Sequence, residues 1–303
     1  MKLRVAPEVK RALSRGQPVV ALETSVVAQG LPWPRNLESA RACEAAVRRA
    51  GAVPAAIAAL DGGLYVGLSP AQLEHLASPG GALLKLGSRD LAVAVATGRS
   101  GGTTVSATCE LAAAAGIRVF ATGGIGGVHR GFSEHLDISQ DLAAIARFPV
   151  AVVCAGAKSV LDLAATLEVL EALAVPVVGV GTNELPGFYT RTTGLLLEHR
   201  VEWATDAAQL AHARFERLEQ GGLVFALPPP DETALDGKQV ERHLRAALKA
   251  ASAAGIRGKD TTPFLLSELA RRTRGASLAA NLALLENNAR FAGLLAVEYA
   301  KLR

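Results

Sequence analysis

Two charged residues lie within apolar runs, where an isolated charge is costly. Glu23 interrupts "VVALETSVV", and Lys158 follows "VAVVCAGA". Burial favours the protonated form of a carboxyl group and suits it to proton transfer. Desolvation lowers the pKa of a lysine, whose neutral amine can form a Schiff base with an aldehyde. Each has a structural alternative: a carboxylate paired with an arginine or backbone amides, or a lysine stem along the core with its head in water.

Acidic and histidine side chains gather between residues 129 and 141. They are His129, Glu134, His135, Asp137 and Asp141. If the segment is helical, Asp137 and Asp141 share one face, and their oxygens would suit Mg²⁺ or Mn²⁺. The alternative is that Asp137 or Ser139 only caps a helix.

Glycine-rich segments offer places for a phosphate group. "GGTT" at 101–104 is expected to open a helix, where free amides and two hydroxyls would bind an anion, unless Thr103 is an ordinary cap. The glycines between 123 and 127 permit close backbone approach but form no GxGxxG motif, and "GIRGKD" lacks Walker spacing. An open-chain sugar phosphate would suit an amine, a carboxylate and a phosphate loop together.

The elements that must position these groups alternate between strand and helix. We expect a strand at 18–27, a helix at 36–50, a hairpin turning at 61–63 and a strand over "VAVVCAG". We expect a further helix to begin directly after Lys158, where its N-terminus would add positive potential. Such alternation predicts an α/β fold: three α/β/α layers around a largely parallel or mixed sheet. We expect a single domain over 1–303, with an α/β portion over about 1–230 and a helical portion over about 231–303 packed on it.

Composition narrows the possible partners. The 303 residues are 50% hydrophobic and 20% charged, with a formal net charge of +4. There is no basic stripe interleaved with aromatics, so we expect no nucleic-acid partner. There is no apolar run long enough for a membrane span or a signal peptide, so we expect no membrane partner. Three cysteines without a CxxC motif indicate buried thiols in a reducing compartment, and we expect a cytoplasmic protein.

Long ordered motifs over about residues 18–300 resemble the pseudouridine-5'-phosphate glycosidase (indigoidine synthase A-like) family. They are "ALETSVVAQGLPWPRNLE", "GGTTVSAT", "FATGGIGGVHRG", "DISQDL", "VVCAGAKS", "GKDTTPFLL" and "SLAANLALLENNA". The resemblance implies reversible cleavage of the C–C glycosidic bond of pseudouridine 5'-phosphate to uracil and ribose 5-phosphate. It also implies a divalent cation, typically Mn²⁺, and a homotrimer.

The resemblance also implies a role for individual residues. Glu23 matches the acid/base, Lys158 the lysine that forms the covalent sugar adduct, and Asp137 the metal ligand. The positions implied to contact substrate are Lys85, Val105, Ser139, Gln140, Asp141 and Asn281, with His129 beside them. The chain departs from the family pattern at Leu227, where Asn-Pro is usual, and over 132–136, which affects substrate-contact detail rather than a residue assigned to chemistry.

Two other functions are alternatives to the glycosidase. A sugar-phosphate kinase would need a nucleotide loop and a DxxGAGD-like motif, neither of which is present. A non-catalytic sugar-phosphate sensor would leave Glu23 and Lys158 without a use, and the chain carries nothing resembling a DNA-binding or effector domain.

Overall fold

The computed structural model describes residues 1–256 and 261–303, with the side chains of 134, 135, 252 and 261–263 left undescribed. Eleven strands form one mixed sheet. They are β1 (Leu3–Val5), β2 (Val19–Leu22), β3 (Val53–Leu60), β4 (Gly63–Val66), β5 (Leu84–Leu86), β6 (Gly101–Thr103), β7 (Val119–Ala121), β9 (Ala151–Cys154), β11 (Val177–Val180), β12 (His199–Val201) and β13 (Leu223–Ala226). A separate antiparallel pair joins β8 (Val128–His129) to β10 (Leu161–Asp162).

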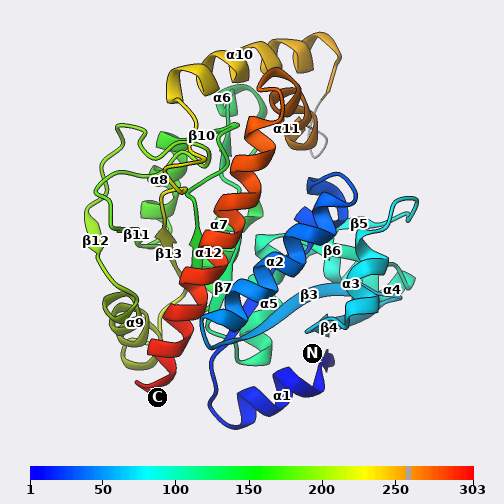
Figure 1. Ribbon diagram of the computed structural model, residues 1–303, viewed down its shortest axis with the longest axis vertical. Coiled ribbons are helices and arrows are strands. Elements are labelled where there is room, and N and C mark those ends of the chain that lie inside the picture. The colour runs from blue at the N-terminus through cyan, green and yellow to red at the C-terminus, as the bar shows by residue number, and fades with distance from the viewer. Residues whose placement is uncertain (257–260) are drawn as a thin grey trace.

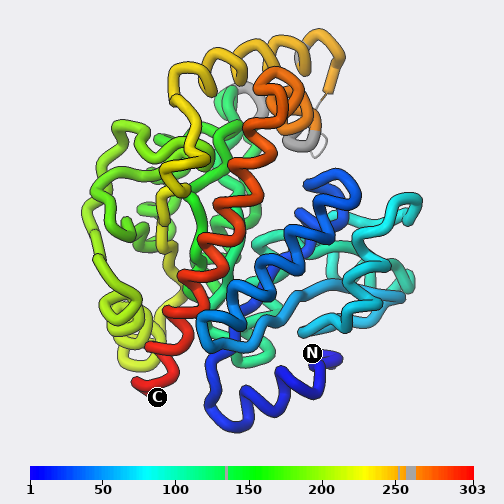
Figure 2. The backbone as a smooth tube through the Cα atoms, viewed as in Figure 1, coloured from blue at the N-terminus to red at the C-terminus, as the bar shows by residue number. Residues whose placement is uncertain are grey.

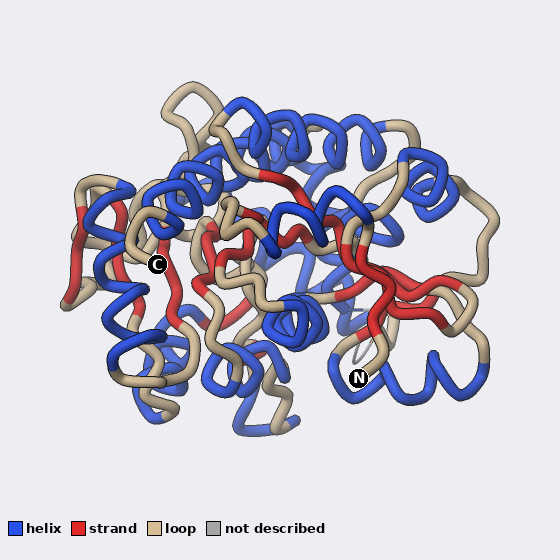
Figure 3. Tube along the Cα trace, turned by 90° about the horizontal axis from the view of Figure 1, so that it is seen from below, coloured by secondary structure: helices blue, strands red, loops and turns tan. Residues whose placement is uncertain are grey.

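Helices cover this sheet on both sides (Figures 1 and 3). The α-helices are α1 (Pro7–Ser14), α2 (Arg35–Arg49), α3 (Pro70–Ala77), α4 (Leu91–Thr97), α5 (Val105–Ala115), α6 (Phe132–His135), α7 (Gln140–Arg147), α8 (Leu163–Ala172), α9 (Ala204–His212), α10 (Gly237–Ala253), α11 (Thr261–Arg272) and α12 (Ala276–Ala300). Shorter segments are the π-helices η1 (Val26–Gly30) and η3 (Ala213–Arg217) and the 3-10 turn η2 (Ser88–Asp90).

The strand order is β1-β4-β3-β2-β7-β9-β13-β11-β12, with β6 joining β5 to β3. From β2 through β12 every pairing is parallel, whereas β3 pairs antiparallel with β4 and β6. The predicted α/β class and the hairpin at 61–63 are therefore confirmed. Strands β7, β9 and β13 are buried along their whole length, which is the pattern of a parallel sheet covered on both faces.

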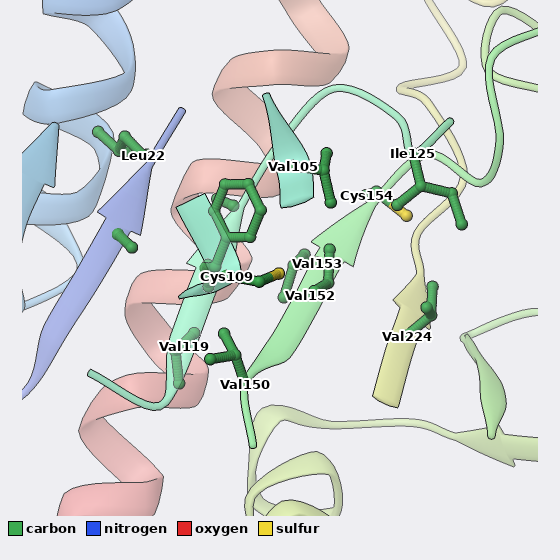
Figure 4. Packing of buried hydrophobic residues seen from close by; sticks show 14 of the residues in the cluster. Leu22, Val105, Cys109, Val119, Ile125, Val150, Val152, Val153, Cys154 and Val224 are labelled. Carbon is green, nitrogen blue, oxygen red and sulfur yellow. The ribbon is translucent and has the colours of Figure 1, made fainter. Parts of the chain in front are cut away.

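One long helix, α12, packs across the sheet. Helix α12 packs against α2 and α9 and crosses β2, β7 and β9, as the red ribbon in Figure 1 and the tube in Figure 2 show. Helix α5 packs against α7, and both contact strands of the sheet. Figure 4 shows the valines of β7 and β9 between these layers, with Cys109 of α5 and Cys154 among them. The fold has the three expected layers.

The three cysteines are free and buried, as predicted. Burial raises the pKa of the Cys43 and Cys154 thiols to about 12, so both are protonated and unreactive at neutral pH. Among the described residues, no helix is both long and apolar enough to cross a bilayer.

The strand predicted over 18–27 is shorter in the structure. Strand β2 ends at Leu22, and the chain turns into π-helix η1 at Val26. Thr24 holds this turn, because its hydroxyl donates to Ile57 O at 2.6 Å and its carbonyl accepts from Ala28 N at 2.9 Å. Glu23 therefore lies just beyond the carboxyl end of a strand.

Candidate active site

Three neighbouring parallel strands deliver polar residues to one edge of the sheet. Glu23 follows β2, Thr122 follows β7, and Lys158 lies four residues beyond the end of β9. Because β2, β7 and β9 pair in register and run parallel, their carboxyl ends lie together. Ligands of open α/β sheets bind at this edge.

The helix expected directly after Lys158 starts later. Helix α8 begins at Leu163, after the short strand β10, so no helix N-terminus lies at Lys158 and that expectation was wrong. The start is fixed by Asp162, whose side chain accepts a hydrogen bond from Ala165 N at 3.0 Å. Lys158 instead lies in a loop, with its backbone N–H donating to Ile125 O at 3.1 Å.

A first cavity, which we call the Glu23 cavity, opens at this edge of the sheet. Its polar lining includes Glu23, Gln29, Lys85, Lys158 and Asn281. Apolar walls come from Val26, Phe188, Leu266 and Leu285. The cavity thus brings a carboxylate and two amines into one partly apolar space, although Glu23 and Lys158 are 135 positions apart in the chain.

Glu23 is held by two hydroxyl groups. Ser25 Oγ donates to Glu23 Oε2 at 2.6 Å, and Thr122 Oγ1 donates to Glu23 Oε1. Glu23 is only 8% exposed, so its carboxyl group reaches little beyond these hydroxyls and the cavity. No arginine forms an ion pair with Glu23 among the described residues, so the structural alternative of a Glu–Arg pair does not apply.

A second cavity, the Asp137 cavity, opens beside the first and is larger. Its lining includes Arg89, Thr104, His129, Asp137, Ser139 and Gln140. Lys85 and Lys158 line both cavities, so the two amines stand where the cavities meet. Lys85 comes from β5 and Lys158 from the loop after β9.

Asp137 and Asp141 do not share a helix face. Helix α7 begins at Gln140, with Ser139 as its N-cap, so Asp137 lies outside the helix and the alternative that Ser139 caps a helix is the one observed. Asp141 is 5% exposed, and its carboxylate accepts from Ser106 N and Gly126 N, each at 2.9 Å. Asp141 therefore braces the N-terminus of α5 and the loop after β7.

The "GGTT" segment also differs from expectation. Gly101–Thr103 form strand β6, and α5 begins only at Val105, with Thr104 at the N-cap position. The Thr103 hydroxyl points into the core and donates to Ile57 O at 2.6 Å. Thr103 is therefore neither a cap nor an anion ligand, and of the two threonines only Thr104 lines the Asp137 cavity.

Close packing explains the glycines at two positions. A Cβ on Gly102 would lie 2.5 Å from Thr24 O, and one on Gly126 would lie 2.3 Å from Ser139 Oγ. At Gly102 the neighbour is backbone of the turn that carries Glu23. At Gly126 it is the cap of α7, so a side chain would push apart the loop and helix that carry the site.

His129 stands between a carboxylate and the two amines. Its Nδ1 lies 3.8 Å from Asp137 Oδ2. Burial lowers the pKa of His129, nearby Lys85 and Lys158 lower it further, and Asp137 opposes them. The imidazole is therefore neutral at neutral pH, and its contact with Asp137 is not an ion pair.

Three of the remaining residues implied to contact substrate line the two cavities, and Val105 lines neither. Ser139 Oγ accepts from Asp141 N, and Gln140 Oε1 accepts from Arg89 N at 3.2 Å. Asn281 of α12 is 7% exposed and lines the Glu23 cavity. Val105 is buried in the core at the first turn of α5, next to Thr104.

The donor set suits only a loosely held divalent cation. Among the described residues, no three His, Cys, Asp or Glu side chains come close enough to form a cage. Asp137, whose side chain is 41% exposed, offers carboxylate oxygens to the cavity, whereas both oxygens of Asp141 are engaged. Mg²⁺ and Mn²⁺ accept such sites, with water and substrate phosphate completing the ligands. Asp137 is compatible with this kind of binding.

Sequence reasoning missed the residues that shape the Glu23 cavity from other elements. Thr122 and Ser25 hold the carboxylate, and Phe188 forms part of an apolar wall. Phe188 has a left-handed backbone (φ 68°), unusual for a bulky residue, and its N–H donates to Ala155 O at 3.0 Å. Ser25 lies within "ALETSVVAQGLPWPRNLE" and Thr122 within "FATGGIGGVHRG", but only the fold brings the two hydroxyls together.

Comparison with known proteins identifies the family that this chain matches. The family model described as "Indigoidine synthase A like protein" matches residues 8–298. A pseudouridine-5'-phosphate glycosidase of Myxococcus xanthus is 66% identical over 301 residues, covering 99% of both chains, and one of Herpetosiphon aurantiacus is 55% identical over 298 residues, covering 98% of this chain and 97% of its own. Among solved structures, a prealnumycin C-glycosynthase in complex with ribulose 5-phosphate superposes with a TM-score of 0.91 at 38% identity, covering 99% of this chain and 97% of the other. An indigoidine synthase A-like protein of Thermotoga maritima superposes with a TM-score of 0.86, also at 38% identity, covering 94% of each chain.

Proposed function

Because the chain belongs to the indigoidine synthase A like protein family, we propose that it reversibly cleaves the C–C glycosidic bond of pseudouridine 5'-phosphate, giving uracil and ribose 5-phosphate. Relatives at 66% and 55% identity carry the name of that activity, and a structural relative binds a pentulose phosphate. The observation that carries the proposal is that Glu23 and Lys158, from separate strands, line one cavity.

The chemistry requires both groups. A C-glycoside has no leaving oxygen to protonate, so a pair of carboxylates alone is insufficient. We propose that the C1'–O4' bond breaks and O4' takes a proton, while Lys158 Nζ bonds to C1' and loses a proton. Glu23 moves these protons and then delivers one to C5 of the base.

Cleavage then follows from the nitrogen lone pair. It forms a C=N bond to C1' as the C1'–C5 bonding pair returns to the uracil ring. Water adds to the iminium, releases ribose 5-phosphate and restores the amine of Lys158. One water is consumed overall, and the same steps run backwards in synthesis.

The two cavities suggest how the substrate divides between them. We assign the base to the Glu23 cavity, where Asn281 offers an amide and Phe188 an apolar wall. We assign the sugar phosphate to the Asp137 cavity, with Lys85 at the junction to attract phosphate oxygens. Anchoring the phosphate would use its binding energy to orient C1' against Lys158.

A cation, a trimer and a compartment complete the proposal. A divalent cation, typically Mn²⁺, held by Asp137 would supply positive charge to neutralise the phosphate oxygens. The homotrimer and the cytoplasmic location are proposed on the family resemblance and the composition alone.

The test is uracil release from pseudouridine 5'-phosphate with Mn²⁺, with EDTA, and by the Lys158→Ala protein. We expect metal-dependent uracil formation that disappears in Lys158→Ala while the circular dichroism spectrum is unchanged. A folded wild-type protein that releases no uracil would refute the proposed substrate. Full activity of Lys158→Ala would refute the role of the lysine.

A further inference from the structure

The carboxylate of Glu23 is gripped on both oxygens by side-chain hydroxyls, which we call the hydroxyl clamp (Ser25 and Thr122). Ser25 Oγ donates to Oε2 at 2.6 Å, and Thr122 Oγ1 donates to Oε1. Ser25 is 9% exposed and Thr122 is 1% exposed, so water competes little for these bonds. The clamp joins the turn after β2 to the end of β7.

Thr122 is itself held firmly by the backbone. Its N–H donates to Val153 O of β9 at 3.0 Å, and its carbonyl accepts from Asn288 Nδ2 at 2.8 Å. The same amide group reaches Gly123 O at 3.4 Å. Asn288 is fully buried on α12, so α12 and β9 together fix the direction of the Thr122 hydroxyl. Branching at Cβ restricts the remaining rotamers.

From this geometry we propose that Ser25 and Thr122 are positioning residues that orient the Glu23 carboxylate and stabilise its ionised form. The inference rests on the proposed function for its catalytic meaning. A carboxylate that accepts two hydroxyl hydrogen bonds is favoured in its charged state. It cannot rotate freely, so its remaining lone pairs keep one direction towards the cavity. The clamp therefore prepares Glu23 to accept the proton that Lys158 loses when it bonds to C1'.

A purely structural role makes a different prediction. If the hydroxyls only satisfied a buried carboxyl group, removing one would lower stability and leave the pH dependence of turnover unchanged. If they set the ionisation of Glu23, removing one would shift the acidic limb of the pH profile to higher pH, because the carboxylate form would be less favoured.

The experiment compares Thr122→Val, which keeps the shape and removes the hydroxyl, with Thr122→Ser, which keeps the hydroxyl. Thr108→Val serves as the control, since Thr108 is a buried threonine of α5 whose hydroxyl donates to Thr103 Oγ1 at 2.9 Å and does not touch Glu23. For each protein, kcat and KM are measured between about pH 5 and 9, the range in which catalytic acids and bases titrate.

We expect kcat of Thr122→Val to fall by about 10- to 100-fold with KM little changed, which is part of the usual contribution of general acid–base catalysis. We also expect the acidic limb of its pH profile to move to higher pH. Thr122→Ser should recover most of both effects, and Thr108→Val should keep the wild-type profile. An unchanged profile in Thr122→Val, whether or not kcat falls, would overturn the proposal.

A carbon NMR titration of the Glu23 carboxyl, assigned with Glu23→Gln, separates this inference from the proposed function. We expect the titration midpoint to rise in Thr122→Val relative to wild type. An unchanged midpoint would overturn the clamp even if uracil is formed. A raised midpoint in a protein that forms no uracil would support the clamp and refute only the proposed substrate.

Discussion

Replacing Asp141 by asparagine distinguishes two roles for this residue: holding the backbone around the site in place, or contacting the substrate. The resemblance places Asp141 among the substrate contacts, yet its two oxygens accept hydrogen bonds from Ser106 N and Gly126 N. An asparagine there can offer only one carbonyl oxygen. Its NH₂ group would face a backbone N–H, and the buried negative charge near the first turn of α5 would be lost.

The magnitude follows from these contacts. A hydrogen bond to a charged group contributes about 1.5–3 kcal/mol, and Asp141→Asn breaks one and weakens the other. The charge at the helix N-terminus contributes about 0.3–1 kcal/mol more. We therefore expect a loss of about 3 kcal/mol in the free energy of unfolding and a fall of several degrees in Tm.

The assay is urea unfolding of wild type and Asp141→Asn, followed by fluorescence, beside uracil release at a temperature where both are folded. Glu168→Gln, an exposed position of α8, is the carboxyl-to-amide control. Destabilisation of about 3 kcal/mol with reduced activity is the expected result. A variant that unfolds like wild type but has lost activity would refute the bracing argument and make Asp141 a direct ligand.

Three further predictions concern other contacts. Gly126→Ala would place Cβ 2.3 Å from Ser139 Oγ and displace residues of the site. We therefore expect a folded protein whose kcat/KM for uracil release is at least about 10-fold lower than that of wild type. Wild-type kinetics would contradict this. Asn288→Ala removes the amide that holds the end of β7 and should cost about 1–3 kcal/mol in urea unfolding; no loss would mean that those carbonyls find other donors. Tyr299→Phe removes the 2.7 Å hydrogen bond that most strongly lowers the pKa of Glu216. A carboxyl group whose pKa is lowered by folding stabilises the protein at pH values above its unfolded pKa, and this stabilisation is lost as pH falls through its folded pKa. Tyr299→Phe should therefore be about 1–2 kcal/mol less stable than wild type at pH 7, and this difference should shrink below about pH 4.5. A difference that does not change with pH would contradict this.

The sequence predicts the fold well where pattern and periodicity agree. The apolar run at "VAVVCAG" is a buried parallel strand, and the helix expected at 36–50 is observed as α2. The strand predicted before Lys158 was sufficient to bring this lysine to the edge of the sheet, whereas Glu23 was expected inside a strand and lies just beyond its end. That rule needs only strand ends and parallel pairing, both of which short apolar runs indicate.

What the sequence could not predict depends on contacts between distant segments. A valine-rich run predicts a continuing strand at 23–27, but Thr24 bonds to β3 and the chain turns there. Spacing relates Asp137 to Asp141 only within a helix, whereas the backbone amides that bind Asp141 come from α5 and the loop after β7. The bond from Thr122 to Glu23 spans 99 positions and follows from strand order alone.

Three further segments bear on the family resemblance. Lys259 and Asp260 of "GKDTTPFLL" lie outside the described residues. Leu227 donates its N–H to Cys154 O at 2.8 Å and packs against the core, so its departure from the family pattern is accommodated by the sheet. Residues 132–135 form the short helix α6, and Leu136 after it is exposed.

The central claim is that Lys158 bonds to C1 of the sugar, and the most direct test is to trap that bond. Wild type, Lys158→Ala and Lys85→Ala are incubated with ribose 5-phosphate, reduced with borohydride, digested and analysed by mass spectrometry. We expect a reduced pentose phosphate on the peptide that contains Lys158, in wild type and in Lys85→Ala, and none in Lys158→Ala. An adduct on Lys85, or uracil release by wild type with no adduct on Lys158, would contradict that claim.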